Sequence, residues 1–344
     1  MWKSDLPEID VWVVARRMES LAFESNREIE EISVVNNEDP ENELVRFSGH
    51  ESFACRYAWL PKALQAVVTA PDIFSNEDAA MVELGVGKNM VRSIRFWAEA
   101  GGMVEPADVG LVPSRLGHQI FLDNGFDCFM EDVTTLWLIH WKLSTAANPL
   151  LAWDFLLNRW QEAEFSESRV LVALQKEVGA LDRKASNVTL RQHLSIFVHT
   201  YLPARARWGD ISEDNLDCPL TELELLAKVG ERDSKESAGR REPVYAFRRE
   251  DKPTISHGLF AFCVNDFWNR RYSKEKTLPA RAVASGYGSP GQIFKIPEPE
   301  IYQRLAEIDS TTSGRIRYSD SEALPQLSRV AQLNDSALIG NAYG

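Results

Sequence analysis

The sequence has 344 residues, of which 44% are hydrophobic and 26% charged, and its formal net charge is −13. This length and composition predict a globular protein of two or three domains with a sizeable buried core. No apolar run of about 18 residues and no basic-then-apolar leader is present, so we expect a cytoplasmic protein with no membrane partner. The cysteines form no C-x-x-C pair, which argues against a zinc ribbon and fits reduced thiols.

The acidic charge is concentrated at the N-terminus. Residues 1–45 contain 12 acids and 4 Lys or Arg, a net charge of −8. Segments 183–207 and 267–296 are instead rich in Lys and Arg. Because salt screens charge beyond about 10 Å, such local segments can hold phosphates on an acidic protein. They can equally be solvated faces, so net charge alone does not exclude a nucleic-acid partner.

The clearest local pattern is a helix, a glycine turn and a second helix over residues 75–102. Ser75 is expected to cap the first helix, and Gly85-Val86-Gly87 is expected to form the turn. The second helix is predicted from Lys88 to about Ala100, because its apolar residues recur at the helical period. These apolar residues are Met90, Val91, Ile94, Trp97 and Ala98.

This order is typical of a winged helix-turn-helix domain, in which the second helix presents a polar face to the major groove. Residues 103–105 and 108–112 are expected to be the strands of the wing, and Ser114 is expected to cap the next helix. The alternative is a helical core hairpin whose cations are merely solvated. In the first interpretation the residues that bind double-stranded DNA are Lys88, Asn89, Arg92 and Arg95, with Arg46 and Arg56 on nearby phosphates.

The rest of the chain is predicted to be mostly helical. Residues 126–160 are rich in aromatic and aliphatic side chains and are expected to form helical core, and residues 220–268 are consistent with helix, strand and helix. The fold class is therefore mostly α: a winged helix-turn-helix domain, then a helical domain, with a second winged-helix-like unit as one interpretation of the C-terminal part. The predicted parts are an acidic segment (1–45), the DNA-binding domain (46–125), the helical domain (126–210), a mixed α/β domain (211–308) and a polar tail (309–344).

Several segments together resemble one bacterial family, the SspB-type proteins of the Ssp DNA phosphorothioation systems. The resemblance spans about residues 46–308, and its first two segments are the most distinctive. The segments are Phe47-Ser48-Gly49-His50-Glu51-Ser52-Phe53, the run Leu84 to Trp97, Glu131 to Trp141, Glu213 to Leu220, and Pro290 to Lys295.

The resemblance implies a function and a set of partners. SspB-type proteins act beside a cysteine desulfurase, an ATPase and an ATP-pyrophosphatase-like sulfur-transfer protein, which replace a phosphate oxygen of DNA with sulfur. The SspB-type member is regarded as a nicking endonuclease, and the implied biological role is DNA phosphorothioate modification and anti-phage defence. The acidic segment 1–45 and the tail lie outside the resemblance.

The residues themselves leave the chemistry of nicking open, because no recognised nuclease signature is present. Strand cleavage needs either a divalent metal, here Mg²⁺ or Mn²⁺, or an acid–base side chain. His50 and Glu51 are the first catalytic candidates, although they can also be a turn that caps a helix. The candidate metal ligands are Asp127 with Glu131 and Glu213 with Asp214, each of which can equally cap a helix or accept a salt bridge. His140, His193 and His199 lie in apolar stretches and are expected to be hydrogen-bonded core histidines.

The leading hypothesis is therefore a winged-helix DNA nickase. Two alternatives stay open: a non-catalytic DNA-recognition subunit that guides the sulfur-transfer complex, and a transcriptional regulator.

Overall fold

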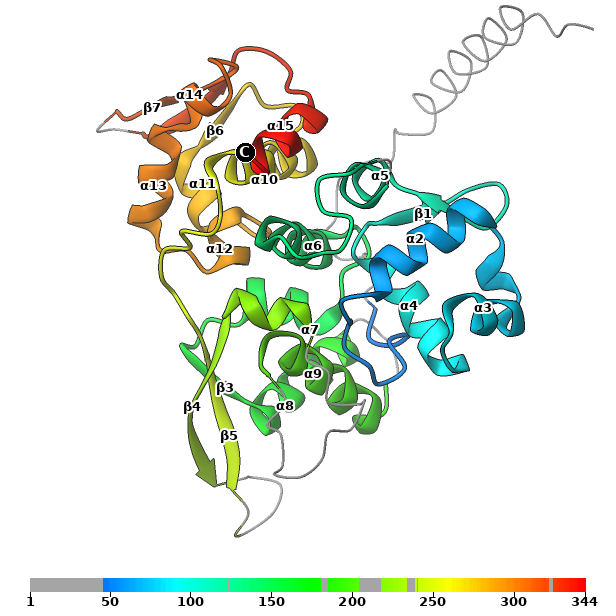
Figure 1. Cartoon of the computed structure of the whole chain (residues 1–344). Coiled ribbons are helices and arrows are strands. Elements are labelled where there is room, and N and C mark those ends of the chain that lie inside the picture. The colour runs from blue at the N-terminus through cyan, green and yellow to red at the C-terminus, as the bar shows by residue number, and fades with distance from the viewer. Residues whose placement is uncertain are drawn as a thin grey trace, which may run out of the picture. The chain divides into compact units, whose positions relative to one another are not determined.

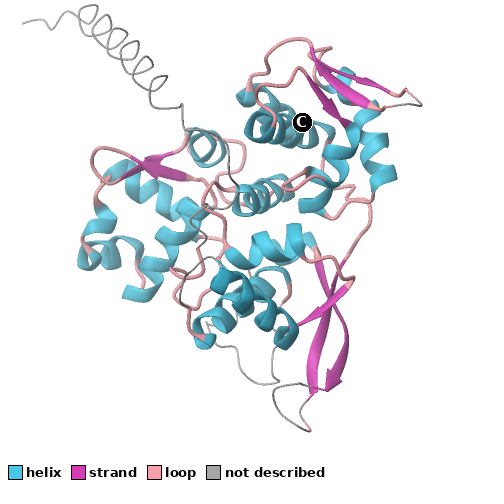
Figure 2. Cartoon of the chain, turned by 180° about the vertical axis from the view of Figure 1, so that it is seen from behind, coloured by secondary structure: helices cyan, strands magenta, loops and turns pink. Residues whose placement is uncertain are grey.

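The computed structural model describes residues 46–122, 124–180, 185–203, 218–233, 239, 241–321 and 324–344. All of them belong to one compact unit, Leu44–Gly344, and the acidic segment 1–45 lies outside the described residues. Helices predominate within these ranges, and the strands form three small antiparallel sheets (Figures 1 and 2). This confirms a helix-dominated fold with a minor strand component. In the ranges given above, every helix is too short or too polar to cross a lipid bilayer.

The first elements of this unit are helices that meet at sharp turns. Gly85 follows helix α3 in the left-handed region at φ 66°, which glycine adopts at little cost. The capping residue of the same helix is Asn76, whose side chain accepts the Ala79 N–H, and not Ser75 as predicted. Ser75 instead closes a short 3₁₀ turn. The elements are α2 (Trp59–Thr69), η2 (Ile73–Ser75), α3 (Glu77–Leu84) and α4 (Lys88–Ala100).

Helix α4 has the predicted bounds and buries most of the predicted stripe. Val91, Ile94, Trp97 and Ala98 are buried, while Met90 is half-buried against the same core. The antiparallel strands β1 (Val104–Pro106) and β2 (Leu111–Pro113) follow, close to where two strands were predicted. The Ser114 side chain then caps α5 (Arg115–Phe121), as predicted, by accepting the Gly117 N–H.

The middle of the chain is the helical core that its aromatic composition predicts. Helix α6 is buried on nearly every side, and His140 within it joins two other elements. Its ring nitrogens lie 2.7 Å from the Tyr201 hydroxyl and 3.1 Å from the Ile293 carbonyl oxygen, which confirms a hydrogen-bonded core histidine. The same prediction is wrong for His199, which is exposed because it lies on the outer face of its helix. The elements here are α6 (Val133–Thr145), α7 (Leu151–Asp154), the π-helical turn η3 (Phe155–Arg159), α8 (Glu167–Ala180) and α9 (Asn187–Tyr201).

A long hairpin follows the 3₁₀ turn η5 (Pro219–Leu223), where the sequence pattern indicated helix and strand. Strands β4 (Leu226–Asp233) and β5 (Arg241–Phe247) pair with each other, and β5 also pairs with β3 (Glu164–Ser166) from the helical middle. The sheet order β3-β5-β4 therefore joins segments about 80 residues apart in sequence (Figure 1). The strand expected at residues 244–247 and the helix expected at 258–268 are confirmed as β5 and α10 (His257–Arg271). The helix expected from Leu220 to Val229 is wrong, because most of that segment is strand β4, whose pairing with β5 no local pattern reveals.

The C-terminal segment also differs from the polar tail expected over 309–344. Strands β7 and β8 join β6 in the sheet order β6-β8-β7, and α15 packs against α10. Ile316, Leu327 and Leu338 are buried there. Ile316 lies on β7, which pairs with β8, and Leu327 lies on β8, which also pairs with β6. Leu338 lies on α15, which packs against α10, so distant segments supply part of this apolar core. The elements are α10 (His257–Arg271), β6 (Thr277–Pro279), α11 (Ala280–Ser285), α12 (Pro290–Phe294), α13 (Glu298–Ala306), α14 (Ile308–Thr311), β7 (Ile316–Ser319), β8 (Gln326–Arg329) and α15 (Asp335–Ala342).

The turn between β1 and β2 packs against the backbone of Pro71, and a substitution in the turn tests this contact. Gly110 has φ +70°, and a Cβ there would lie 2.0 Å from the Pro71 carbonyl oxygen. We expect Gly110→Ala to lower the free energy of unfolding by about 2 kcal/mol or more, through backbone strain and overlap. Gly179→Ala, at an exposed helical site with open space around it, is the matched control in urea denaturation. Equal stability of the two variants would contradict the placement of this turn.

Candidate nucleic-acid interface

The outer face of α4 carries the cations predicted to bind DNA. Lys88, Asn89, Arg92 and Arg95 are all exposed, and 45–55% of each cationic side chain is accessible to solvent. The helix begins directly after the glycine turn, so Lys88 and Asn89 lie in its first turn. Because the opposite face is packed into the core, α4 presents this polar face on a rigid support.

Carboxylates accompany each of these cations. Glu77, in the first turn of α3, lies 2.5 Å from Lys88 Nζ and 2.7 Å from Arg92 Nε. Glu99 lies 2.8 Å from Arg95 Nε, one turn further along α4. The hydrogen bonds from Lys88 and Arg92 lower the pKa of the Glu77 carboxyl. The face is therefore a set of exposed ion pairs, which the sequence pattern did not reveal because Glu77 is on another helix.

The loop before α2 is packed tightly onto α4. Gly49 has φ +108°, and a Cβ at this position would lie 2.8 Å from the Phe96 ring. The Ser93 hydroxyl donates to the His50 carbonyl oxygen at 2.8 Å, and Trp97 Nε1 donates to the Phe53 carbonyl oxygen at 3.0 Å. The distinctive sequence 47–53 therefore forms a shaped loop over the helix.

Glu51 lies in this loop beside the α4 face and not beside a histidine base. It has a left-handed backbone, φ 47°, and its carboxylate is 4.0 Å from Arg92 Nη1. Ser52, also left-handed at φ 72°, accepts a hydrogen bond from Gln192 of α9. Non-glycine residues in this region store strain that the surrounding contacts must hold. The loop thus connects the α4 face to α9.

His50 is buried, and its ring bonds His193 of α9 and not Glu51. The Ala152 N–H donates to His193 Nε2 at 3.1 Å, so neutral His193 carries its proton on Nδ1 and donates it to His50 Nε2, also at 3.1 Å. His50 Nδ1 then carries the other proton and is buried with no partner in the described ranges. Burial lowers the pKa of His50 to about 4 and that of His193 to about 3. Because the His50 lone pair is already used, acting as a base would require breaking the bond to His193.

Arg46 and Arg56, the predicted phosphate contacts, lie over different aromatic rings. The Arg46 guanidinium is 4.8 Å from the centre of the Phe96 ring, while Arg56 lies over Phe53 and Trp59. Arg46 lines a pocket of about 290 Å³ beside α4, together with two of the predicted DNA-binding arginines. The structure thus brings Arg46 to the α4 face. The pocket residues are Arg46, Gly49, Phe74, Glu77, Val91, Arg92, Arg95, Phe96 and Glu99.

The predicted metal ligands are placed apart from this pocket or outside the described residues. Asp127 and Glu131 lie in a turn before α6 and not on one helix as expected. Both Asp127 oxygens accept hydrogen bonds, from the Glu131 and Asp132 N–H groups and from the Thr135 hydroxyl, so this carboxylate closes the turn. The other predicted pair, Glu213 and Asp214, lies outside the described residues. Within the described ranges, no three His, Cys, Asp or Glu side chains are grouped as a metal site would require.

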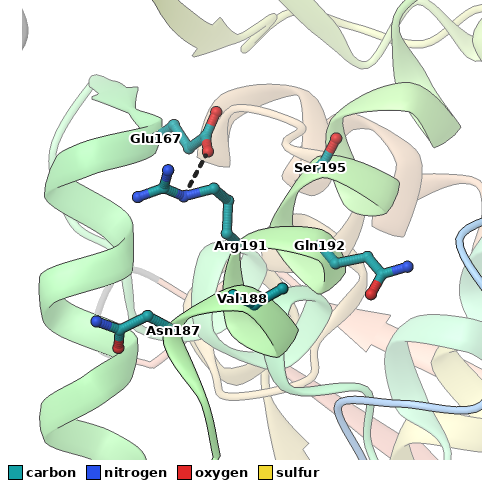
Figure 3. Close-up of a pocket in the computed structure, with 6 residues that line it drawn as sticks. All are labelled: Glu167, Asn187, Val188, Arg191, Gln192 and Ser195. Atoms are coloured by element: carbon teal, nitrogen blue, oxygen red, sulfur yellow. Dashed lines mark ion pairs between the residues drawn. The ribbon is translucent and has the colours of Figure 1, made fainter.

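A second, larger hollow includes Gln192, the partner of Ser52, in its lining. It encloses about 640 Å³ and is lined by residues of α8 and α9 (Figure 3). Arg191 and Glu167 form an ion pair there at 3.4 Å. The basic segment 183–207 indicated this surface, but not its shape, because the hollow needs both helices.

A family model described as "Protein of unknown function (DUF4007)" matches residues 47–343. The chain belongs to this family. Two solved structures share the fold of the DUF4007 chain. "Magnesium ion-bound SspB crystal structure" is 23% identical over 89% of both chains with a TM-score of 0.74. "SspB crystal structure" is 22% identical over 88% of this chain and 89% of the other, with a TM-score of 0.72. The resemblance to SspB-type proteins is thus confirmed in the fold, and no curated protein matches the chain.

The buried histidines predict a pH dependence of stability. His50, His140 and His193 have pKa values lowered by burial from 6.5 to about 4, 4 and 3. As the pH falls through 6.5, the unfolded chain binds protons that the folded chain does not, so stability falls. The expected loss between pH 6.5 and 5.5 is about 1 kcal/mol per histidine, or about 3 kcal/mol in total. Urea denaturation at these two pH values measures this loss of stability. Constant or rising stability would refute the lowered pKa values of the three histidines.

Proposed function

We propose that this protein binds double-stranded DNA through helix α4. The observation that carries the proposal is the exposed face Lys88, Asn89, Arg92 and Arg95 on the second helix of a helix–turn–helix. In this arrangement α3 braces α4, which enters the major groove, and β1 with β2 acts as the wing. An amide such as Asn89 can pair with adenine, and one arginine with guanine, while the other cations contact phosphates.

The carboxylates beside these cations do not prevent such binding. Exposed ion pairs contribute about 0–1 kcal/mol each, because water and salt screen both partners. A duplex presents a row of phosphates, and the counterions that these release on binding favour the exchange. The pairs therefore lower the affinity for DNA without removing the cations from reach. The net charge of −13 acts in the same direction, although −8 of it lies in residues 1–45.

The fold supports a place for this DNA binding in a phosphorothioation system. The similarity to two SspB structures covers nearly nine-tenths of the chain. We therefore propose that the protein works with a cysteine desulfurase, an ATPase and an ATP-pyrophosphatase-like protein in DNA sulfur modification and anti-phage defence. A transcriptional regulator would instead bind only at its own promoter, which genome-wide footprinting distinguishes.

Two substitutions test the role of α4. Arg92→Ala and Arg95→Ala should each weaken duplex binding by about 1–3 kcal/mol, because each removes a contact to a base or a phosphate. The readout is a gel-shift titration at fixed salt. Arg317→Ala, on the exposed face of β7, is the matched control and should bind as the wild type does. Unchanged affinity in both α4 variants would remove α4 from the interface.

Strand nicking is the second candidate function, and one observation favours it. A structure with the same fold is described as magnesium ion-bound. Asp127 and Glu131 are the less suited pair, since both Asp127 oxygens already accept hydrogen bonds from protein donors. Glu213 and Asp214 stay as the proposed ligands. The rival is a non-catalytic subunit that only recognises DNA.

A plasmid assay separates these two possibilities. A nickase should convert supercoiled plasmid to open circles when Mg²⁺ or Mn²⁺ is added, and EDTA should block the conversion. The double variant Glu213→Gln with Asp214→Asn should lose the activity and keep duplex binding. Tight binding with no strand breaks under any of these conditions would select the recognition subunit.

A further inference from the structure

The pocket beside α4 combines three arginines with an apolar floor. Val91 and Phe96 are buried beneath it, and Arg92 and Arg95 reach it from successive turns of the helix. Its volume of about 290 Å³ leaves room for a small anionic group. Guanidinium groups bind phosphate through paired, directional N–H donors, so three of them around one hollow favour an oxyanion.

The backbone of Arg46 is held in place at this pocket by two hydrogen bonds. Its backbone pairs with the segment before α7: the Arg46 N–H donates to the Pro149 carbonyl oxygen at 2.9 Å, and the Leu151 N–H donates to the Arg46 carbonyl oxygen at 2.8 Å. The guanidinium lies over the Phe96 ring, and the contacts of the described residues give it no carboxylate partner. Arg46 is therefore a positioned cation whose hydrogen-bond donors are available to a ligand.

The two carboxylates of the pocket show how an oxyanion would be held. Glu77 accepts from Arg92 at 2.7 Å, and Glu99 accepts from Arg95 at 2.8 Å, both through the arginine Nε. The lining thus contains three arginines and two glutamates, a net charge of +1. A phosphodiester carries one negative charge and offers two oxygens of similar geometry. It would neutralise the pocket and take over a carboxylate's position.

Resting on the DNA binding proposed above, we propose that this pocket binds one phosphodiester group of the DNA backbone next to the α4 contact. Arg46 makes the first contact, and Arg92 or Arg95 completes it by exchanging its glutamate for phosphate oxygens. Glu77 then sets the affinity, because it competes with the phosphate for both Lys88 and Arg92. A fixed phosphate here would set the register of α4 in the groove.

Duplex titrations over a range of salt test this assignment. Arg46→Gln should weaken binding about tenfold equally for all sequences and reduce the salt slope of log affinity by about one. Arg46→Lys should keep the slope and recover part of the affinity. Glu77→Gln should strengthen binding several-fold, and Arg317→Ala is again the control. Wild-type affinity and slope in Arg46→Gln would overturn the site.

A second measurement tests phosphodiester binding at the pocket independently of duplex binding by the protein. Dimethyl phosphate is a phosphodiester without bases, and its binding can be followed by the arginine Nε–H resonances in NMR. We expect the Arg46 and Arg92 signals to shift at millimolar concentration, and the Arg92 shift to be lost in Arg46→Gln. Shifts without duplex binding would keep the site and reject the DNA-binding proposal. Duplex binding with no response of Arg46 to either probe would reject the site alone.

Discussion

The candidate site depends on one packing contact, that between the loop of residues 49–53 and helix α4. Ser93 and Trp97 donate to two carbonyl oxygens of the loop, so these backbone acceptors stay satisfied although the loop is pressed onto the helix. Gly49 lets the chain approach Phe96 more closely than any side chain would allow. Because the loop is fixed there, Arg46 stands over Phe96 and Glu51 comes within reach of Arg92.

The buried pair His50 and His193 links the loop to the helical core. The His50 ring bonds His193 of α9, and His193 in turn accepts the N–H of Ala152 in α7. Loop, α7 and α9 are thereby joined by two uncharged hydrogen bonds in a buried environment. Uncharged imidazoles suit this position, since a proton added to either ring would place a charge beside the other in the core. The pair is thus a structural joint beneath the proposed DNA-binding face.

The exposed face of α4 combines cations that attract phosphates with carboxylates that compete for the same cations. Each α4 cation already has a carboxylate, so a single phosphate gains little by replacing it, whereas a duplex replaces several pairs at once. Such an arrangement lowers the affinity for isolated anions relative to extended polyanions. The proposed interaction with nucleic acid is compatible with the strongly acidic overall charge, because it is local and screening separates it from distant acids.

The sequence by itself determined the local elements: the glycine turn, helix α4 with its buried stripe and exposed cations, the two short strands after it and the Ser114 cap. These follow from propensity and periodicity within about a dozen residues. The tertiary structure alone decided which residues share the site. Glu77 meets Lys88 across a turn, Arg46 meets Phe96 from a distant part of the chain, and His50 meets His193. Likewise β8 pairs with β6, and α15 packs against α10. Pairings between distant segments depend on how whole faces pack, which no short window of sequence encodes.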